Sequence, residues 1–301
     1  MLEQPTEWAR QFTIRLNHRT KGWLAALMRA FTRFGEHLAS TTAAGMSFFA
    51  IFSFFPLLVF LVMATGKIIS QPNIDEVLRN FLATYFPVSL EPLLDEVNTM
   101  LESSDSLGFI ALIGFMWAAS SVFNAFMVGI NRAWGRSGIG SMIRSRLVAL
   151  VLVTGFAIVL VLFTIVVTFL KLVAGLLLPF WQQFLLFLIP FLAQVSILYL
   201  LYRWGPAKRS STHSRAALLG AFFTGIALEI TTKIYAWYLQ SGFASYEAIY
   251  GSLGAIIGLL FWVYISSMIL LFGAYLAETI DFRLQHGATM ELPDIFPVPA
   301  K

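Results

Sequence analysis

The chain has 301 residues, of which 58% are hydrophobic and only 12% are charged, and its mean hydropathy is +0.77. A soluble domain carries about twice that share of charged residues, so the composition excludes a soluble globular enzyme and predicts a protein that folds in a bilayer. The absence of cysteine excludes disulfides and thiolate chemistry, and the four histidines are too scattered to indicate a metal cluster. We expect no metal and no cofactor.

Six segments are long and apolar enough to cross a bilayer, which takes about 20 helical residues. Four of them contain no Asp, Glu, Lys or Arg: residues 43–66, 107–130, 147–170 and 252–277. The other two contain polar residues: residues 184–202 include Pro190 and Gln194, and residues 216–240 include Glu229 and Lys233. The sequence therefore predicts an all-α, polytopic membrane protein with six transmembrane helices.

The charges between these spans alternate along the chain. Sixteen of the 20 basic residues fall before the first span, between spans 2 and 3, between spans 4 and 5, and after span 6. The connection 67–106, in contrast, holds seven acids and two basic residues. Because short cytoplasmic loops are enriched in Lys and Arg, we expect both termini to be cytoplasmic.

The sequence predicts that the chain has three parts. Residues 1–39 are expected to form a cytoplasmic, basic, amphipathic helical segment, and residues 40–280 are expected to form the transmembrane domain. Residues 281–301 are expected to form an unstructured cytoplasmic tail. The first segment either lies along the inner leaflet or packs under the bundle as a polar helix. Its apolar side comprises Trp23, Leu27, Phe31, Phe34 and Leu38, with arginines elsewhere. Residues 67–106 predict a helical hairpin over the outer mouth, between spans 1 and 2.

Two of the spans resemble each other. Residues 106–130 and 252–276 share eight identities in 25 aligned positions. Either spans 1 and 2 are an ancestral duplicate of spans 5 and 6, or a restricted apolar alphabet produced the match by chance.

Polar residues within the spans are the candidate functional residues. Trp117, Ser121, Asn124 and Asn131 recur at helical spacing on one face of span 2. They either bond to neighbouring helices or line a hydrated path or a groove for lipid headgroups, and Gln194 on span 4 is a further candidate. Pro56 and Pro190 remove backbone donors and permit kinks in spans 1 and 4.

Glu229 and Lys233 are the charged pair within a span, four residues apart in the favourable order. An ionised side chain at the centre of a membrane helix costs about 2.5–3.5 kcal/mol, so such residues usually face protein or water. Either Lys233 simply reaches the outer interface, or the pair forms a substrate or proton site in which Glu229 titrates.

A second pair of carboxylates, Glu278 and Asp281, lies at the inner end of span 6. We interpret them as solvated acids at a helix end, although a membrane enzyme acting on lipids would need such a pair. The basic loops contain no acids and no aromatic platform for RNA, so they fit anionic lipids of the inner leaflet rather than nucleic acid. The residues concerned are Arg132, Arg136, Arg144, Arg146, Arg203, Lys208 and Arg209.

Several motifs resemble those of one family. They are AGMSFFAIFSFFPLL at 44–58, WAASS at 117–121, LYRWGP at 201–206, YGSLG at 250–254, and FWVY at 261–264 leading to GAY at 273–275. On these motifs the chain resembles the YihY/BrkB family over about residues 40–280. The resemblance implies a bacterial inner-membrane protein, in a family formerly mislabelled as ribonuclease BN, with some members linked to envelope or lipopolysaccharide-precursor export and to serum resistance. It brings no catalytic or binding residues to carry over.

The polar stripe, the abundant glycines and the resemblance together favour a transporter or exporter of a lipidic or amphiphilic envelope component. The alternatives are a scaffold for envelope assembly that transports nothing and, less favoured, a membrane enzyme acting on lipids. Ribonuclease activity is not expected, because the sequence offers no cluster of metal-binding acids and histidines. The sequence indicates no oligomeric state.

Overall fold

The computed structural model describes residues 22–64, 107–135, 179–205, 212–241 and 254–286, together with Asp95 and Thr99. The elements in these ranges are all helices, which confirms the all-α prediction for this part of the chain. They are α2 (Trp23–Glu36), α3 (Ala39–Ala64), α6 (Leu107–Ala133), α8 (Pro179–Trp204), α9 (Ser214–Gln240) and α11 (Gly254–His286).

Five of these helices correspond to predicted spans. Spans 1, 2, 4, 5 and 6 are found as α3, α6, α8, α9 and α11. Four helices, α3, α8, α9 and α11, are long and apolar enough to cross a membrane, as judged by length and composition within the described ranges. The predicted span 147–170 lies outside the described residues, and so does the predicted outer hairpin 67–106 apart from Asp95 and Thr99. The count of six spans therefore stays a prediction.

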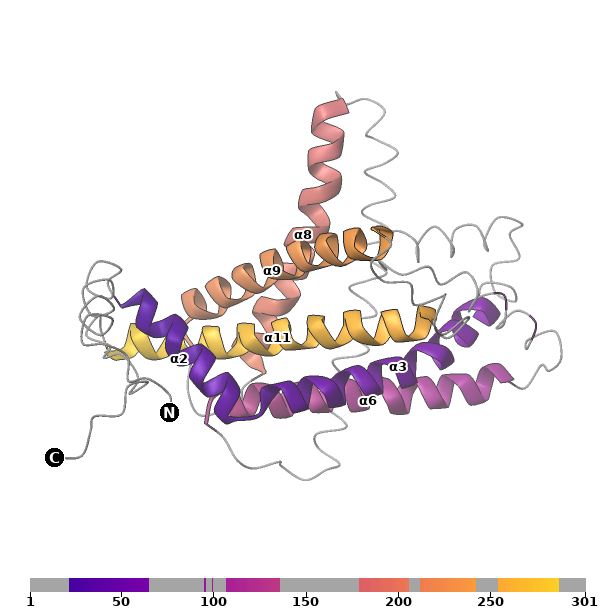
Figure 1. Ribbon diagram of the computed structural model, residues 1–301, viewed down its shortest axis with the longest axis horizontal. Coiled ribbons are helices and arrows are strands. Elements are labelled where there is room, and N and C mark those ends of the chain that lie inside the picture. Colours follow the sequence, from indigo (N-terminus) through magenta and orange to yellow (C-terminus); the bar gives the residue numbers. More distant parts are fainter. Residues whose placement is uncertain are drawn as a thin grey trace.

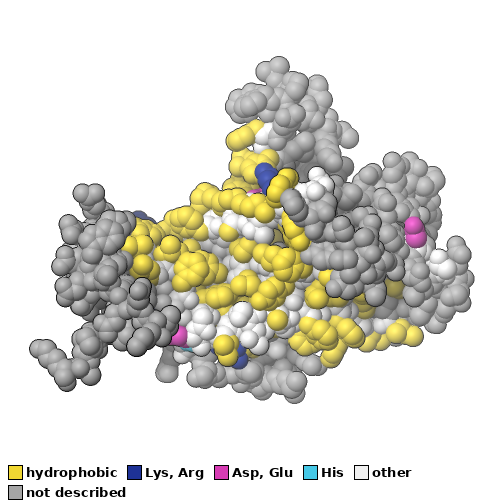
Figure 2. All heavy atoms as spheres, in the orientation of Figure 1, with side chains coloured by type: hydrophobic (Ala, Val, Ile, Leu, Met, Phe, Trp, Pro, Cys, Tyr) yellow, Lys and Arg dark blue, Asp and Glu magenta, His cyan; other side chains and the backbone are white. Residues whose placement is uncertain are grey.

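Two antiparallel helix pairs make up most of the bundle. In Figure 1, α3 runs alongside α6, α9 lies over α11, and α8 is steeply inclined to the other helices. Helix α2 crosses the C-terminal end of α11. Hydrophobic side chains cover much of the surface of these helices and few charged ones appear among them (Figure 2), as expected for helices surrounded by lipid.

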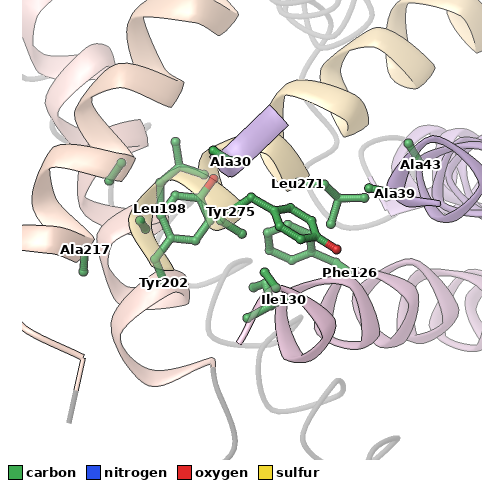
Figure 3. Packing of buried hydrophobic residues seen from close by; sticks show 14 of the residues in the cluster. Ala30, Ala39, Ala43, Phe126, Ile130, Leu198, Tyr202, Ala217, Leu271 and Tyr275 are labelled. Carbon is green, nitrogen blue, oxygen red and sulfur yellow. The ribbon is translucent and has the colours of Figure 1, made fainter. Parts of the chain in front are cut away.

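The core lies near one end of the bundle, where α2, α3, α6, α8, α9 and α11 meet. Figure 3 shows Phe126 and Ile130 of α6 facing Leu271 and Tyr275 of α11, with Tyr202 of α8 beside them. Small residues complete the core: Ala30, Ala39, Ala43, Ala217, Ala221, Ala274 and Ala277. In lipid, the hydrophobic effect contributes little to the association of helices. The close approach of helix backbones at such small residues therefore contributes more to their packing than large side chains do.

Two predicted boundaries differ from the helices observed. Helix α11 continues to His286, so the predicted start of the tail at residue 281 falls inside a helix. Helix α3 begins at Ala39, within the predicted cytoplasmic segment. Pro56 and Pro190 lie inside α3 and α8, and both helices continue through them. A kink at either proline stays a prediction.

Candidate functional site

One end of the bundle gathers the charged helix termini. There Arg33 of α2 reaches the end of α11, Arg132 at the end of α6 donates to Thr42 of α3, and Arg203 at the end of α8 donates to the carbonyl of Thr212. The start of α9 joins the end of α11 at the same place. We call this region, defined by Arg33, Arg132, Arg203, His213, Glu278 and Asp281, the charged end.

Glu278 is buried and ion-paired, so its interpretation as a solvated acid at a helix end is wrong. Its exposed fraction is 9%, and its Oε1 lies 2.6 Å from Nη1 of Arg33. Thr279 Oγ1 lies 3.4 Å from the other carboxylate oxygen. The sequence did not reveal this pair because the two partners are 245 positions apart, and only the fold brings α2 against α11.

The interpretation of Asp281 as a solvated acid is also wrong. Its side chain is 3% exposed and accepts three hydrogen bonds. The donors are the backbone N–H of His213 (2.7 Å), His213 Nδ1 (2.8 Å) and Gln285 Nε2 (3.0 Å). An ionised carboxylate only accepts, so Nδ1 carries the proton in this contact. His213 immediately precedes α9, and a carboxylate at a helix N-terminus is favoured by the helix dipole. Asp281 therefore links α11 to the start of α9.

Arginine and aromatic contacts hold α2 against the last turns of α11. The guanidinium of Arg29 lies 3.8 Å from the ring centroid of Phe282, and that of Arg283 lies 4.3 Å from the ring of Trp23. The pKa of Arg29 is lowered from its ordinary value, mainly because the guanidinium is partly buried. The carboxylate of Glu278 offsets part of this shift, and the positive charge of Arg33 adds to it. An arginine stays protonated throughout the physiological range, so α2 presents a permanent positive charge to Glu278.

A polar knot lies deeper in the bundle, at Tyr202 of α8. Its hydroxyl donates to the carbonyl of Leu270 at 2.7 Å and lies 3.3 Å from Thr224 Oγ1, which itself donates to the carbonyl of Gly220. The knot joins α8, α9 and α11. Sequence reasoning missed it, although Tyr202 stands in one of the motifs on which the family resemblance rests.

We expect Tyr202→Phe to lower the free energy of unfolding by about 1 kcal/mol, because the ring is kept while one buried hydrogen bond is lost. Unfolding of the purified protein in mixed micelles measures this change. Tyr238→Phe on α9, at a half-buried position outside the knot, is the matched control. Equal stability of the two variants would contradict a structural role for the knot.

The structure places the predicted charged pair on α9, with Glu229 half-buried and Lys233 exposed. Among the described residues the two side chains form no ion pair with each other. Instead, Lys233 Nζ lies 5.3 Å from the ring centroid of Phe187 on α8, within reach of a cation–π interaction. Spacing along a helix permits an ion pair but does not enforce one.

The predicted stripe on α6 is half-buried to exposed. Trp117 packs edge-on against Phe52 of α3 at 6.3 Å, and Ser121 Oγ donates to the carbonyl of Trp117 at 3.0 Å. Asn124 and Asn131 are half-buried, as is Gln194 on α8. In Figure 1, α11 runs between α6 and α9, so the stripe and the charged pair are separate sets of residues.

The basic residues expected to meet anionic lipids are described only in part. Arg132 is exposed at the end of α6, and half-buried Arg203 uses Nη1 to bond the carbonyl of Thr212 at 2.7 Å. Arg136, Arg144, Arg146, Lys208 and Arg209 lie outside the described residues. Within the described ranges, no group of three or more His, Cys, Asp or Glu side chains could hold a metal ion.

Comparison with known proteins identifies relatives over nearly the whole chain. The ribonuclease-like protein YfkH of Bacillus subtilis is 27% identical over 291 residues, covering 91% of this chain and 99% of its own length. The UPF0761 membrane protein NTHI0384 of Haemophilus influenzae is 24% identical over 261 residues, covering 83% of this chain and 92% of its own length.

A UPF0761 membrane protein of Azotobacter vinelandii is 27% identical over 255 residues, which are 82% of this chain but only 60% of that relative. No solved structure matches the chain significantly. The sequence profile described as Virulence factor BrkB matches residues 30–292. That match confirms the resemblance drawn from the motifs, and the chain is a membrane protein that belongs to the BrkB virulence factor family.

Proposed function

We propose that the protein is a bacterial inner-membrane transporter or exporter of a lipidic or amphiphilic envelope component. The observation that carries the proposal is the placement of Glu229 and Lys233, an acid and a base on a membrane-length helix whose side chains form no ion pair with each other. Exposed apolar side chains lie to one side of them on α9, namely Ile230, Ile234 and Trp237. An amphiphile matches this surface, because its headgroup can meet the charges while its chains lie on the apolar residues.

We also propose the six-span arrangement with both termini cytoplasmic. Its support is the set of contacts at the charged end, where α3 and α9 begin and α6, α8 and α11 end. Two successive helices that end on the same side require the chain to cross the membrane between them, and residues 147–170 are apolar enough for that crossing. The charged end is then the cytoplasmic side, and exposed Arg132 is placed to meet anionic headgroups there.

Variants of the charged pair test the transport proposal. In reconstituted vesicles, we expect Glu229→Gln to slow protein-dependent movement of a fluorescent phospholipid about tenfold, because the headgroup loses an ionic contact worth ~1.4 kcal/mol. Lys233→Leu should have an effect of similar size. Glu36→Gln, which neutralises an exposed acid on α2, is the matched control and should leave the rate unchanged.

Two results of that experiment would count against the proposal. If wild-type protein moves no more lipid than empty vesicles, a scaffold without transport becomes the better account. If the lipid moves but Glu229→Gln behaves like Glu36→Gln, the charged pair has no part in transport.

The alternative of a membrane enzyme gains no support from Glu278 and Asp281, because Arg33 and His213 already engage these carboxylates. We therefore do not extend the ribonuclease-like name of YfkH to this chain.

A further inference from the structure

Both arginines of helix α2 face the protein, while part of its apolar side faces outward. Arg33 pairs with Glu278, and Arg29 lies over Phe282. On the same side, Ala25, Ala26 and Ala30 are completely buried. The remaining charge of α2, Glu36, stands at its C-terminal end. The arginines are therefore used within the fold and are not free to bind headgroups.

The outward face of α2 is apolar. Trp23, Leu27 and Phe31 follow one another at intervals of four residues and so lie along one side of the helix. Their exposed fractions are 40%, 41% and 61%. Hydrophobic side chains gather over this part of the molecule in Figure 2, at the end where α2 crosses α11 in Figure 1. An aqueous surface does not suit such a face, because α2 itself contributes no charged side chain to it.

The apolar face is continuous with the membrane-length surface of α11. The ring of Phe31 lies 4.6 Å from that of Phe272, which belongs to the apolar stretch Ile256–Gln285. At the other end of α2, Trp23 meets Arg283, eleven residues further along α11 and therefore ~16 Å nearer its C-terminus. Helix α2 thus runs antiparallel to α11, with Phe31 beside the middle of α11 and Trp23 beside its C-terminal end.

We infer that α2 inserts obliquely into the bilayer interface at the charged end, with Phe31 deepest, Leu27 at the boundary of acyl chains and headgroups, and Trp23 nearest the water. Apolar contacts hold it there, since the arginines are bound to α11. Insertion therefore does not require anionic lipid and does not weaken with salt, unlike that of a helix that binds headgroups through its basic residues. The inference is independent of the proposed transport.

Spin labels on single cysteines can test this inference, because the natural chain contains no cysteine. Trp23→Cys, Leu27→Cys and Phe31→Cys would be labelled in the full chain in nanodiscs, and collisions with oxygen and with a water-soluble nickel complex measured. Leu260→Cys, exposed in the apolar stretch of α11, is the reference for lipid, and Arg215→Cys, at an exposed charged position near the start of α9, is the reference for water. Each labelled variant should keep the unfolding temperature of the wild type.

The expected depth increases in the order position 215, 23, 27, 31 and 260, with the same values in neutral and anionic lipid and at low and high salt. Labels at 27 and 31 that collide with nickel as often as the label at 215 would overturn the inference in favour of an aqueous helix. Labels protected from both reagents would overturn it in favour of a protein cover, either residues 1–21 of this chain or a second copy. Insertion that needs anionic lipid and disappears in salt would show that the arginines drive it.

Discussion

Replacing Glu278 with alanine should lower the free energy of unfolding by about 3 kcal/mol. The carboxylate is buried against Arg33, and removing one member of a buried ion pair leaves the other charge without compensation. The loss should be larger than for most single substitutions, because Arg33 belongs to α2 and Glu278 to α11, so the docking of a whole helix depends on the pair. Unfolding in mixed micelles measures the change.

Two further variants make this prediction specific. Glu36→Ala removes an exposed acid of α2 and should change the free energy of unfolding by less than ~0.5 kcal/mol. The double variant Arg33→Leu/Glu278→Leu removes both charges and should be more stable than Glu278→Ala, because no buried charge is left alone. A loss for Glu278→Ala no larger than that for Glu36→Ala would contradict the buried pair.

Gly220→Ala should destabilise the protein by about 2–3 kcal/mol, because α9 and α11 are in backbone contact at this position. A Cβ at residue 220 would lie 2.6 Å from Ala277 Cβ, 3.1 Å from Ala277 Cα and 3.2 Å from the carbonyl oxygen of Gly273. Two of these three atoms are backbone, so no rotamer change relieves the overlap. The two helices would have to separate, and the contact between His213 and Asp281 at their shared end would weaken with them.

Gly45→Ala is the matched control for this prediction. Both glycines stand inside long membrane helices, but no atom lies within 4 Å of a Cβ added at residue 45. The control should therefore stabilise α3 slightly through its better helix propensity, by up to ~1 kcal/mol. Thermal unfolding in detergent separates the two, and similar unfolding temperatures for both variants would mean that α9 and α11 are not in close contact.

Hydropathy alone located the described membrane helices well, because the thickness of the bilayer dictates their length. The prediction for α9 began two residues late and ended at the observed residue, and α6 began where it was predicted. The end of α11 was missed because Glu278 and Asp281 looked like the edge of a span. Apolar residues continue past these acids, at Ile280, Phe282 and Leu284, and that continuation was the available signal.

The chemistry of the charged end could not be predicted from the sequence in the same way. Arg33 with Glu278 and His213 with Asp281 join positions far apart in the chain, so no local pattern relates them. Local spacing placed Glu229 and Lys233 on one helix but did not identify the groups that they contact. The ammonium group of Lys233 can reach either Glu229 or the ring of Phe187, and only the fold shows that it lies by the ring. Periodicity likewise gave α2 an apolar side without showing that its arginines turn towards α11.

The proposal that Glu229 and Lys233 hold the headgroup of an amphiphile is tested most directly by a density map of the full chain in a nanodisc of bacterial phospholipids. The account predicts a resolved lipid-like density on α9, with its headgroup within hydrogen-bonding distance of Glu229 or Lys233 and its chains along Ile230 and Ile234. A continuous layer of acyl chains past Glu229, with Lys233 extended to the membrane surface and no headgroup beside either residue, would contradict it.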